Sequence, residues 1–168
     1  MSQPHPVPLS PDRHGRQRWR RFTSYAFAAG RRSVPVVLAE IGQVAAAMPV
    51  VFARGSAGVE VLGLLRAAPG GDSAYVSPEG LWLAAYVPSL LRVHPFSARP
   101  SGDGRMLLLV DEASGLVLPE GAAAEGAEPF FGADGQPSAA LAGLVEFFRQ
   151  REASALRTAD AATARDWR

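Results

Sequence analysis

Cysteine is absent from this chain of 168 residues. Its absence excludes disulfide bonds, thiolate nucleophiles and zinc–thiolate centres. Long apolar runs are lacking as well: the longest, such as residues 81–88 and 106–110, fall far short of the roughly 20 residues that a membrane-spanning helix needs. The first residues lead through prolines into arginines, without the apolar core of a secretory signal. We therefore expect a protein with no membrane span, located in the cytoplasm.

Lysine is also absent, so all 17 basic side chains are arginines. Residues 1–32 hold seven arginines and a single acid, a net charge of +6, whereas the remaining ten arginines and fifteen acids carry −5. Clustered guanidinium groups suit a phosphate backbone. However, Trp19 and Phe22 interleave with Arg20 and Arg21, which favours docking of this basic segment on a protein surface. A nucleic-acid partner is therefore the weaker hypothesis, and Arg20 and Arg21 are candidate binding residues.

The sequence contains no motif of nucleophilic or phosphate chemistry. No serine stands in a nucleophile-elbow pattern, and the glycines of residues 69–72 and 101–104 have the spacing of turns. A metal site of two histidines and one carboxylate would have to use His14 and His94 with Asp111, or with the neighbouring acid. A metal-dependent enzyme of the non-haem iron kind, acting on a peptide or small molecule, is thus the alternative hypothesis. We favour a non-catalytic protein without a cofactor.

Three acids have structural interpretations. Asp111 and Glu112 follow an apolar run, and adjacent residues of a strand point to opposite faces, so they cannot serve one substrate as an acid–base pair. We expect Asp111 to cap the turn that follows and Glu112 to pair with an arginine. Glu40 lies on a mainly apolar segment, and buried carboxylates usually have partners. Arg20 or Arg21 is the partner that we expect for Glu40.

Length and an apolar content of 48% suit one folded domain. We expect an extended basic, proline-rich arm over residues 1–18 and a single domain over residues 19–168. Residues 106–110 lack alternation, which predicts a central strand buried on both faces. Ser138 is a suitable N-cap for a long amphipathic helix that ends near residue 162.

Shorter patterns complete the predicted fold. Apolar periodicity predicts a short helix over residues 35–47, and Pro88 begins another. Turn residues separate the predicted strands, which cover residues 50–53, 59–65, 74–76, 96–98 and 105–111. Residues 114–137 are typical of a loop. The fold class is therefore α+β, with an antiparallel sheet of about five or six strands, two short helices and one long C-terminal helix.

Bulky aromatic residues flanked by proline suggest a binding surface. Such residues can present a rigid hydrophobic face to an extended peptide or to a partner protein. The candidates are Trp82, Tyr86, Phe130 and Phe131. The alternative is that aromatic residues form the core, which suits Trp82 and Phe96 better than Phe130 and Phe131. We therefore expect Phe130 and Phe131 at the surface.

An ordered set of motifs resembles the SapC family, a bacterial group named for its association with surface-layer protein loci. The motifs are His14, Tyr25-Ala26-Phe27-Ala28, Val34-Pro35, Ala39-Glu40, Met48-Pro49-Val50-Val51-Phe52, Trp82-Leu83, Tyr86-Val87-Pro88, His94-Pro95-Phe96, Asp111-Glu112 and Glu128-Pro129-Phe130-Phe131. The resemblance covers about residues 14–160. Met48 and His94 stand where the family usually has tyrosine, so a site that used those tyrosines would be altered here.

The resemblance implies an accessory role. Proteins of this kind are associated with surface-layer export loci and with outer-membrane receptor loci. By that association we expect a peptide or protein partner, with self-association as a further option, and we expect no stand-alone catalyst.

Overall fold

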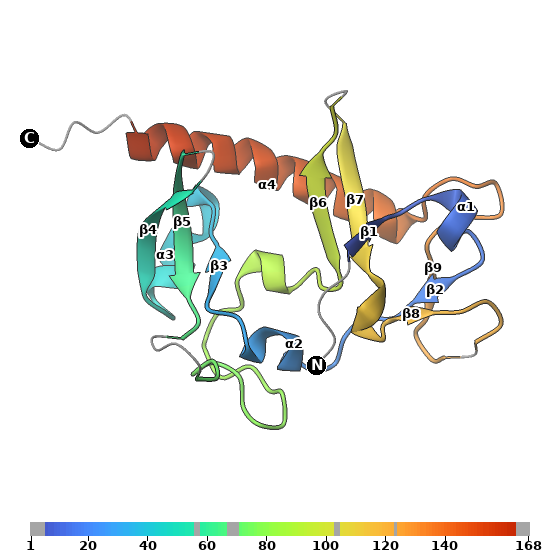
Figure 1. Ribbon diagram of the computed structural model, residues 1–168, viewed down its shortest axis with the longest axis horizontal. Helices are drawn as coiled ribbons and strands as arrows, with labels where there is room; N and C mark the ends of the chain where they lie inside the picture. The colour runs from blue at the N-terminus through green and yellow to red at the C-terminus, as the bar shows by residue number, and fades with distance from the viewer. Residues whose placement is uncertain (1–5, 56–57, 67–70, 103–104, 123, 164–168) are drawn as a thin grey trace, which may run out of the picture. The chain divides into compact units, whose positions relative to one another are not determined.

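The computed structural model describes residues 6–55, 58–66, 71–102, 105–122 and 124–163. They form two compact units, each built from two stretches of chain. Unit 1 contains residues 6–22 and 93–150, and unit 2 contains residues 23–92 and 151–163. Helix α4 (Ala139–Thr163) contributes its first part to unit 1 and its second part to unit 2 (Figure 1).

The first sheet of unit 1 has the strand order β1-β7-β6 and is antiparallel throughout. It consists of β1 (Pro6–Pro8), β6 (Phe96–Pro100) and β7 (Met106–Asp111). Leu108, Leu109 and Val110 of β7 are buried. The prediction of a buried central strand over residues 106–110 is confirmed, as is its pairing with the strand that begins at Phe96.

A second, smaller sheet of unit 1 has the order β8-β2-β9. Its strands are β2 (Arg18–Trp19), β8 (Val117–Leu118) and β9 (Glu128–Pro129). The prediction of a continuous loop over residues 114–137 is therefore wrong in part. Strands of two residues are too short to leave a periodic pattern, and β2 supplies their backbone partner from a distant part of the sequence.

The basic N-terminal segment is built into unit 1. Strand β1 pairs with β7, and the short helix α1 (Pro11–His14) begins at Ser10, whose hydroxyl accepts a hydrogen bond from the Arg13 N–H. Trp19 packs edge-on against Phe96 at 4.7 Å, and Phe96 and His14 pack against Phe130 at 6.2 and 5.5 Å. All four side chains are buried, so aromatic packing anchors this segment.

The sheet of unit 2 has the order β3-β5-β4 and is also antiparallel. It consists of β3 (Ser33–Pro35), β4 (Val50–Gly55) and β5 (Gly58–Leu64). The predicted pairing of residues 50–53 with residues 59–65 is confirmed. Figure 1 shows the β4–β5 pair beside α3. The core beneath the sheet contains Ala28, Val34, Val36, Val44, Met48, Val61, Leu65, Val76 and Leu91.

The helix predicted over residues 35–47 is shorter than expected. The chain forms η1 (Leu38–Glu40) followed by α3 (Ile41–Ala45). Residues 33–35 are held in β3, and the Val36 N–H donates to the Val61 carbonyl at 2.8 Å, so a helix cannot begin before this point. Residues 74–76 form only an isolated bridge, between Val76 and Trp82.

The remaining helical elements are α2 (Ala26–Ala29), η2 (Ser89–Leu91), which follows Pro88 as expected, and η3 (Glu112–Ser114). The long terminal helix is confirmed as α4, with the Ser138 hydroxyl accepting a hydrogen bond from the Leu141 N–H at 3.4 Å. Within the described ranges no helix combines the length and apolar character needed to cross a membrane.

The α+β class and the antiparallel pairing are confirmed, but the strands are divided among three sheets where we expected one. Proline explains part of this division. The edge strands β1, β3, β6 and β9 all contain proline, which has no N–H to donate to a further strand. These edges therefore favour small, separate sheets.

Replacing Phe130 with alanine should lower the free energy of unfolding by about 3–5 kcal/mol, because it removes a fully buried ring at the centre of the aromatic packing in unit 1. The matched control is Phe52→Ala, because Phe52 on β4 is 68% exposed and should change stability little. Urea denaturation of both variants checks this. Equal losses would contradict the packing described for Phe130.

Candidate functional site

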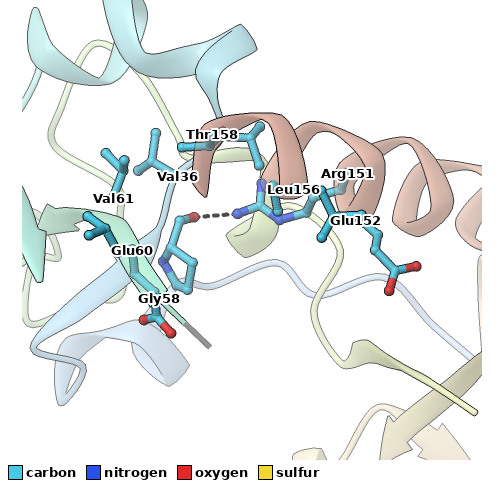
Figure 2. Close-up of a pocket in the computed structure, with 12 residues that line it drawn as sticks. Val36, Gly58, Glu60, Val61, Arg151, Glu152, Leu156 and Thr158 are labelled. Carbon is cyan, nitrogen blue, oxygen red and sulfur yellow. Dashed lines mark hydrogen bonds between the residues drawn. The ribbon is translucent and has the colours of Figure 1, made fainter. Parts of the chain in front are cut away.

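A groove lies in unit 2 beside the beginning of β5 (Figure 2). Its volume is about 280 Å³, near the lower end of the range for ligand-binding pockets. One wall is strand β5, the second is the chain that leaves β3, and the third is the last part of α4. The lining residues are Pro35, Val36, Val37, Gly58, Val59, Glu60, Val61, Arg151, Glu152, Ala155, Leu156 and Thr158. Most of this surface is apolar.

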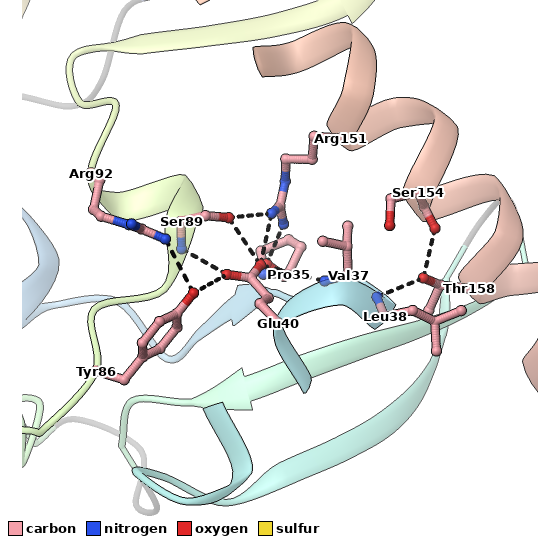
Figure 3. Close-up of polar contacts among 10 residues, drawn as sticks. All are labelled: Pro35, Val37, Leu38, Glu40, Tyr86, Ser89, Arg92, Arg151, Ser154 and Thr158. Atoms are coloured by element: carbon pink, nitrogen blue, oxygen red, sulfur yellow. Dashed lines mark hydrogen bonds and ion pairs between the residues drawn. The ribbon is translucent and has the colours of Figure 1, made fainter. Parts of the chain in front are cut away.

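Arg151 lines the groove from α4, and its guanidinium group is turned toward Glu40 (Figure 3). Its Nη1 lies 2.8 Å from Glu40 Oε1 and also donates to the Ser89 hydroxyl at 2.8 Å. Its Nη2 donates to the Pro35 carbonyl oxygen. The Arg151 and Glu40 side chains are only 11% and 6% exposed. This is a buried ion pair that joins α4 to the turn at η1.

Further donors complete the shell of the Glu40 carboxylate. Oε2 accepts from the Ser89 N–H at 2.9 Å and from the Tyr86 hydroxyl at 3.1 Å. Oε1 accepts from the Ser89 hydroxyl at 3.0 Å and from the Val37 N–H at 3.4 Å. Beyond this shell, Arg92 Nη2 donates to the Tyr86 oxygen at 3.1 Å. Both oxygens of Glu40 are therefore fully engaged, which gives this acid a structural role.

Opposing effects act on the pKa of Glu40. Burial raises this pKa, but the hydrogen bonds from Ser89 and Arg151 and the positive charge of Arg151 outweigh burial, and the net pKa is lowered. Burial, followed by the charge of Glu40, raises the pKa of the Tyr86 hydroxyl. The network thus holds an ionised carboxylate next to a neutral phenol.

The expectation that Arg20 or Arg21 pairs with Glu40 is wrong, because Arg151 takes that place. Both predicted arginines have exposed side chains. Arg21 lies 3.3 Å from Glu128, and the Arg20 backbone N–H donates to the Leu116 carbonyl oxygen. The sequence did contain a signal. Arg151 comes three residues after Phe148 and so lies on the buried stripe of α4, which includes Leu141, Phe148 and Thr158. A cation on such a stripe indicates a buried anionic partner.

A second feature of unit 2 is an aromatic cluster around Trp82. The Trp82 ring lies 5.4 Å from Tyr25 and stacks on Tyr75 at 6.1 Å. Its indole N–H donates to the Tyr86 carbonyl oxygen at 3.0 Å. On either side of Trp82, Leu81 and Leu83 are each 61% exposed. We call Leu81, Trp82 and Leu83 the leucine loop.

The expectation that Phe130 and Phe131 lie at the surface is wrong. Their exposed fractions are 0% and 8%. Phe130 follows β9 directly and enters the aromatic packing of unit 1. Phe131 forms a bridge with Pro137, and the Gly132 N–H donates to the Gln136 carbonyl oxygen, which closes a tight turn. Proline beside an aromatic pair marks a short strand here.

The acids at the end of β7 and the start of η3 have the structural roles expected from the sequence. Asp111 Oδ1 accepts a hydrogen bond from the Ala113 N–H at 3.1 Å and so caps η3. Glu112 receives two hydrogen bonds from Arg13, at 2.7 and 2.6 Å, which lower its pKa. The arginine partner expected for Glu112 is thus Arg13.

The histidines considered for metal binding have other surroundings. His14 is fully buried, its Nδ1 accepts from the Ser10 N–H, and its Nε2 lies 3.3 Å from Glu112 Oε1, without the alignment of a hydrogen bond. His94 packs edge-on against Phe22 at 5.9 Å. In the part of the chain that the structure describes, no three His, Asp or Glu side chains are grouped closely enough to hold a metal ion. His14, His94 and Asp111 therefore form no such group.

Replacing Glu40 with glutamine should lower the free energy of unfolding by about 3–5 kcal/mol, because the buried guanidinium of Arg151 would lose its counter-charge. In the wild type the lowered pKa of Glu40 makes its contribution complete above about pH 4.5, and this contribution is lost as the pH falls further. Urea titrations between pH 7 and pH 3 measure both effects. An unchanged unfolding midpoint in the variant would rule out the proposed importance of the pair.

Burial lowers the pKa of His14, although the charge of Glu112 acts in the opposite direction. The unfolded chain therefore takes up a proton near pH 6.5 that the folded protein rejects, and stability should fall as the pH decreases through this value. We expect a shallower pH dependence between pH 7.5 and pH 5.5 for His14→Gln. His94→Gln is the control, because it removes the other described histidine and leaves His14 in place. Identical slopes in wild type and His14→Gln would contradict a buried neutral His14.

Comparison with known proteins identifies the family. The SapC family model matches residues 9–165. Neither the curated proteins nor the solved structures contain a match. The matched stretch includes the Glu40 network, the leucine loop and the whole of α4. Since it spans nearly the whole chain, the protein belongs to the SapC family.

Proposed function

We propose that this protein is a non-catalytic accessory protein that binds a peptide or protein partner, and that the leucine loop forms the centre of the contact. The observation that carries the proposal is the exposure of Leu81 and Leu83, whose exposed fractions are each 61%. They flank Trp82, whose indole N–H is hydrogen-bonded to the Tyr86 carbonyl oxygen. Apolar side chains presented by an ordered segment are typical of the centres of protein interfaces.

The order of the leucine loop supports this proposal. The Ser77 N–H donates to the Leu81 carbonyl oxygen at 2.9 Å, and the Leu81 N–H donates to the Ser77 hydroxyl oxygen at 3.1 Å. The Leu83 N–H donates to the Tyr75 carbonyl oxygen at 2.9 Å. A loop fixed at both leucines loses little conformational entropy when a partner binds, which favours affinity.

The surroundings of Tyr86 and the state of Glu40 also support a binding role. The guanidinium of Arg92 lies 5.5 Å above the Tyr86 ring, so a cation borders the aromatic cluster. Glu40 is a buried carboxylate, and donors occupy both of its oxygens. It therefore has no position left for proton transfer to a substrate. The cytoplasmic location and the option of self-association stay predictions from the sequence.

The products of neighbouring genes, including surface-layer export and outer-membrane receptor components where present, are the partners to test. Isothermal titration should detect binding of at least one of them to the wild-type protein. Leu81→Ser combined with Leu83→Ser should weaken it at least about tenfold, since central interface residues commonly contribute more than 1 kcal/mol each.

Phe52→Ser is the control for this experiment, because it removes an exposed apolar side chain from β4, outside the leucine loop. It should leave the affinity unchanged. The proposal fails if none of the gene products binds, or if the double leucine variant binds as well as the wild type does.

A further inference from the structure

The groove beside β5 borders a strand edge that lacks a complete partner. Residues along a strand direct their backbone N–H and C=O groups alternately to the two neighbouring strands. The Leu64 N–H bonds to Pro49 on the β4 side, whereas the Val61 carbonyl accepts from Val36 on the β3 side. By this alternation the backbone groups of Val59 face the β3 side, where β3 has already ended at Pro35.

The two β3-side groups of Val59 therefore lie at an open edge. Among the residues that the structure describes, no backbone group is paired with Val59 on this side. Val59 itself lines the groove. An extended chain that continued the path of β3 would lie about 4.8 Å from β5 and would occupy the groove.

The charges of the groove walls favour one kind of occupant. Arg151, the cation among the described lining residues, is engaged by Glu40, Ser89 and Pro35. Thr158 is engaged too, because its hydroxyl donates to the Ser154 carbonyl at 2.8 Å and accepts from the Leu38 N–H at 3.1 Å. The other ionisable residues among the described lining residues are Glu60 on β5 and Glu152 on α4.

Figure 2 shows Glu60 and Glu152 on opposite sides of the groove, the first on β5 and the second on α4. Leu156 is 65% exposed. Around it, Val36 and Val61 belong to the buried core and form an apolar base. The groove thus combines an apolar lining with one acidic residue from β5 and one from α4.

We propose that this groove binds an extended peptide segment in which an apolar residue is flanked by arginine or lysine. The peptide pairs with the backbone of Val59 as an added strand, its apolar side chain contacts Leu156 and the valines, and its basic side chains meet Glu60 and Glu152. Main-chain hydrogen bonds provide affinity in this mode of recognition, and the side-chain contacts provide selectivity. The leucine loop is not among the residues that line the groove. Peptide binding in the groove and partner binding at the leucine loop can therefore be tested independently.

A basic occupant is favoured because Arg151, the cation among the described lining residues, is already engaged. Arg157 lies between Leu156 and Thr158 in the sequence, and Arg54 pairs with Val59 across the strands, but neither is among the described lining residues. An acidic peptide or a phosphate would therefore meet two carboxylates without a compensating positive charge. The groove volume of about 280 Å³ limits the buried part to a few side chains.

Selection from a phage-displayed library of random heptapeptides on the full-length protein tests the proposal. We expect enrichment of sequences with Leu, Val or Ile between basic residues. Glu60→Gln combined with Glu152→Gln should weaken a selected peptide about two- to tenfold, because each exposed ion pair contributes up to about 1 kcal/mol. Glu60→Asp with Glu152→Asp should restore most of the affinity, and added salt should reduce it.

Two further measurements locate the peptide. Leu156→Arg should abolish binding, since it places a large cation in the groove, and Leu156 is exposed enough for the helix to tolerate it. Hydrogen exchange of the Val59 N–H should slow when peptide binds. Methylating the backbone nitrogens at the centre of the peptide should weaken binding by removing the strand pairing.

Several results would overturn the proposal. They are the absence of enriched peptides, enrichment of acidic sequences, or equal binding to the Leu156→Arg variant. Binding that Leu81→Ser with Leu83→Ser abolishes, but that the groove variants leave intact, would refute the groove site and support the leucine loop. Peptide binding that only the groove variants impair would confirm this site, even if the neighbouring gene products fail to bind.

Discussion

The buried carboxylate of Glu40 is the constraint on which the arrangement of unit 2 depends. A carboxylate that is 6% exposed needs donors and a counter-charge, because an isolated charge in the interior is strongly destabilising. Arg151 supplies the counter-charge from a position 111 residues away in the sequence. The same guanidinium also bonds Ser89 and Pro35, so one side chain connects α4, η2 and the end of β3.

This ion pair has consequences beyond local stability. It places the last part of α4 against the segment that leaves β3, and a hydrogen bond between Leu38 and Thr158 continues this contact along the helix. The helix then forms the third wall of the groove through Ala155 and Leu156. Because Arg151 is paired with Glu40, the unpaired charged residues among the described lining residues are Glu60 and Glu152. The charge selectivity that we propose for the groove therefore follows from the pair beneath it.

The sequence predicted those features that depend on neighbouring residues. The β4–β5 pair, the central strand β7, the cap at Asp111 and the start of α4 at Ser138 all follow from local patterns, and the structure confirms them. The sequence predicted that an arginine pairs with Glu112, but it did not predict that this arginine is Arg13. Such features are set by apolar period, turn residues and capping groups, which are visible within a few positions.

Features that depend on distant residues were missed. The strands β8 and β9 exist only because β2 pairs with both of them. Phe130 was expected at the surface because proline precedes it, whereas the rings of His14 and Phe96 surround it. The partner of Glu40 was expected to be Arg20 or Arg21, because the basic segment was expected to dock on the rest of the protein. A better guide was the presence of Arg151 on the buried stripe of a helix, where an unpaired cation would be costly.

A double-mutant cycle on Glu40 and Arg151 tests the central claim most directly. The cycle compares unfolding free energies of the wild type, Glu40→Gln, Arg151→Met and the double variant, all at pH 7. If the pair is the constraint described here, the double variant should lose less stability than the sum of the single losses, by at least about 1.5 kcal/mol. Additive losses, with no coupling between the two residues, would contradict the account.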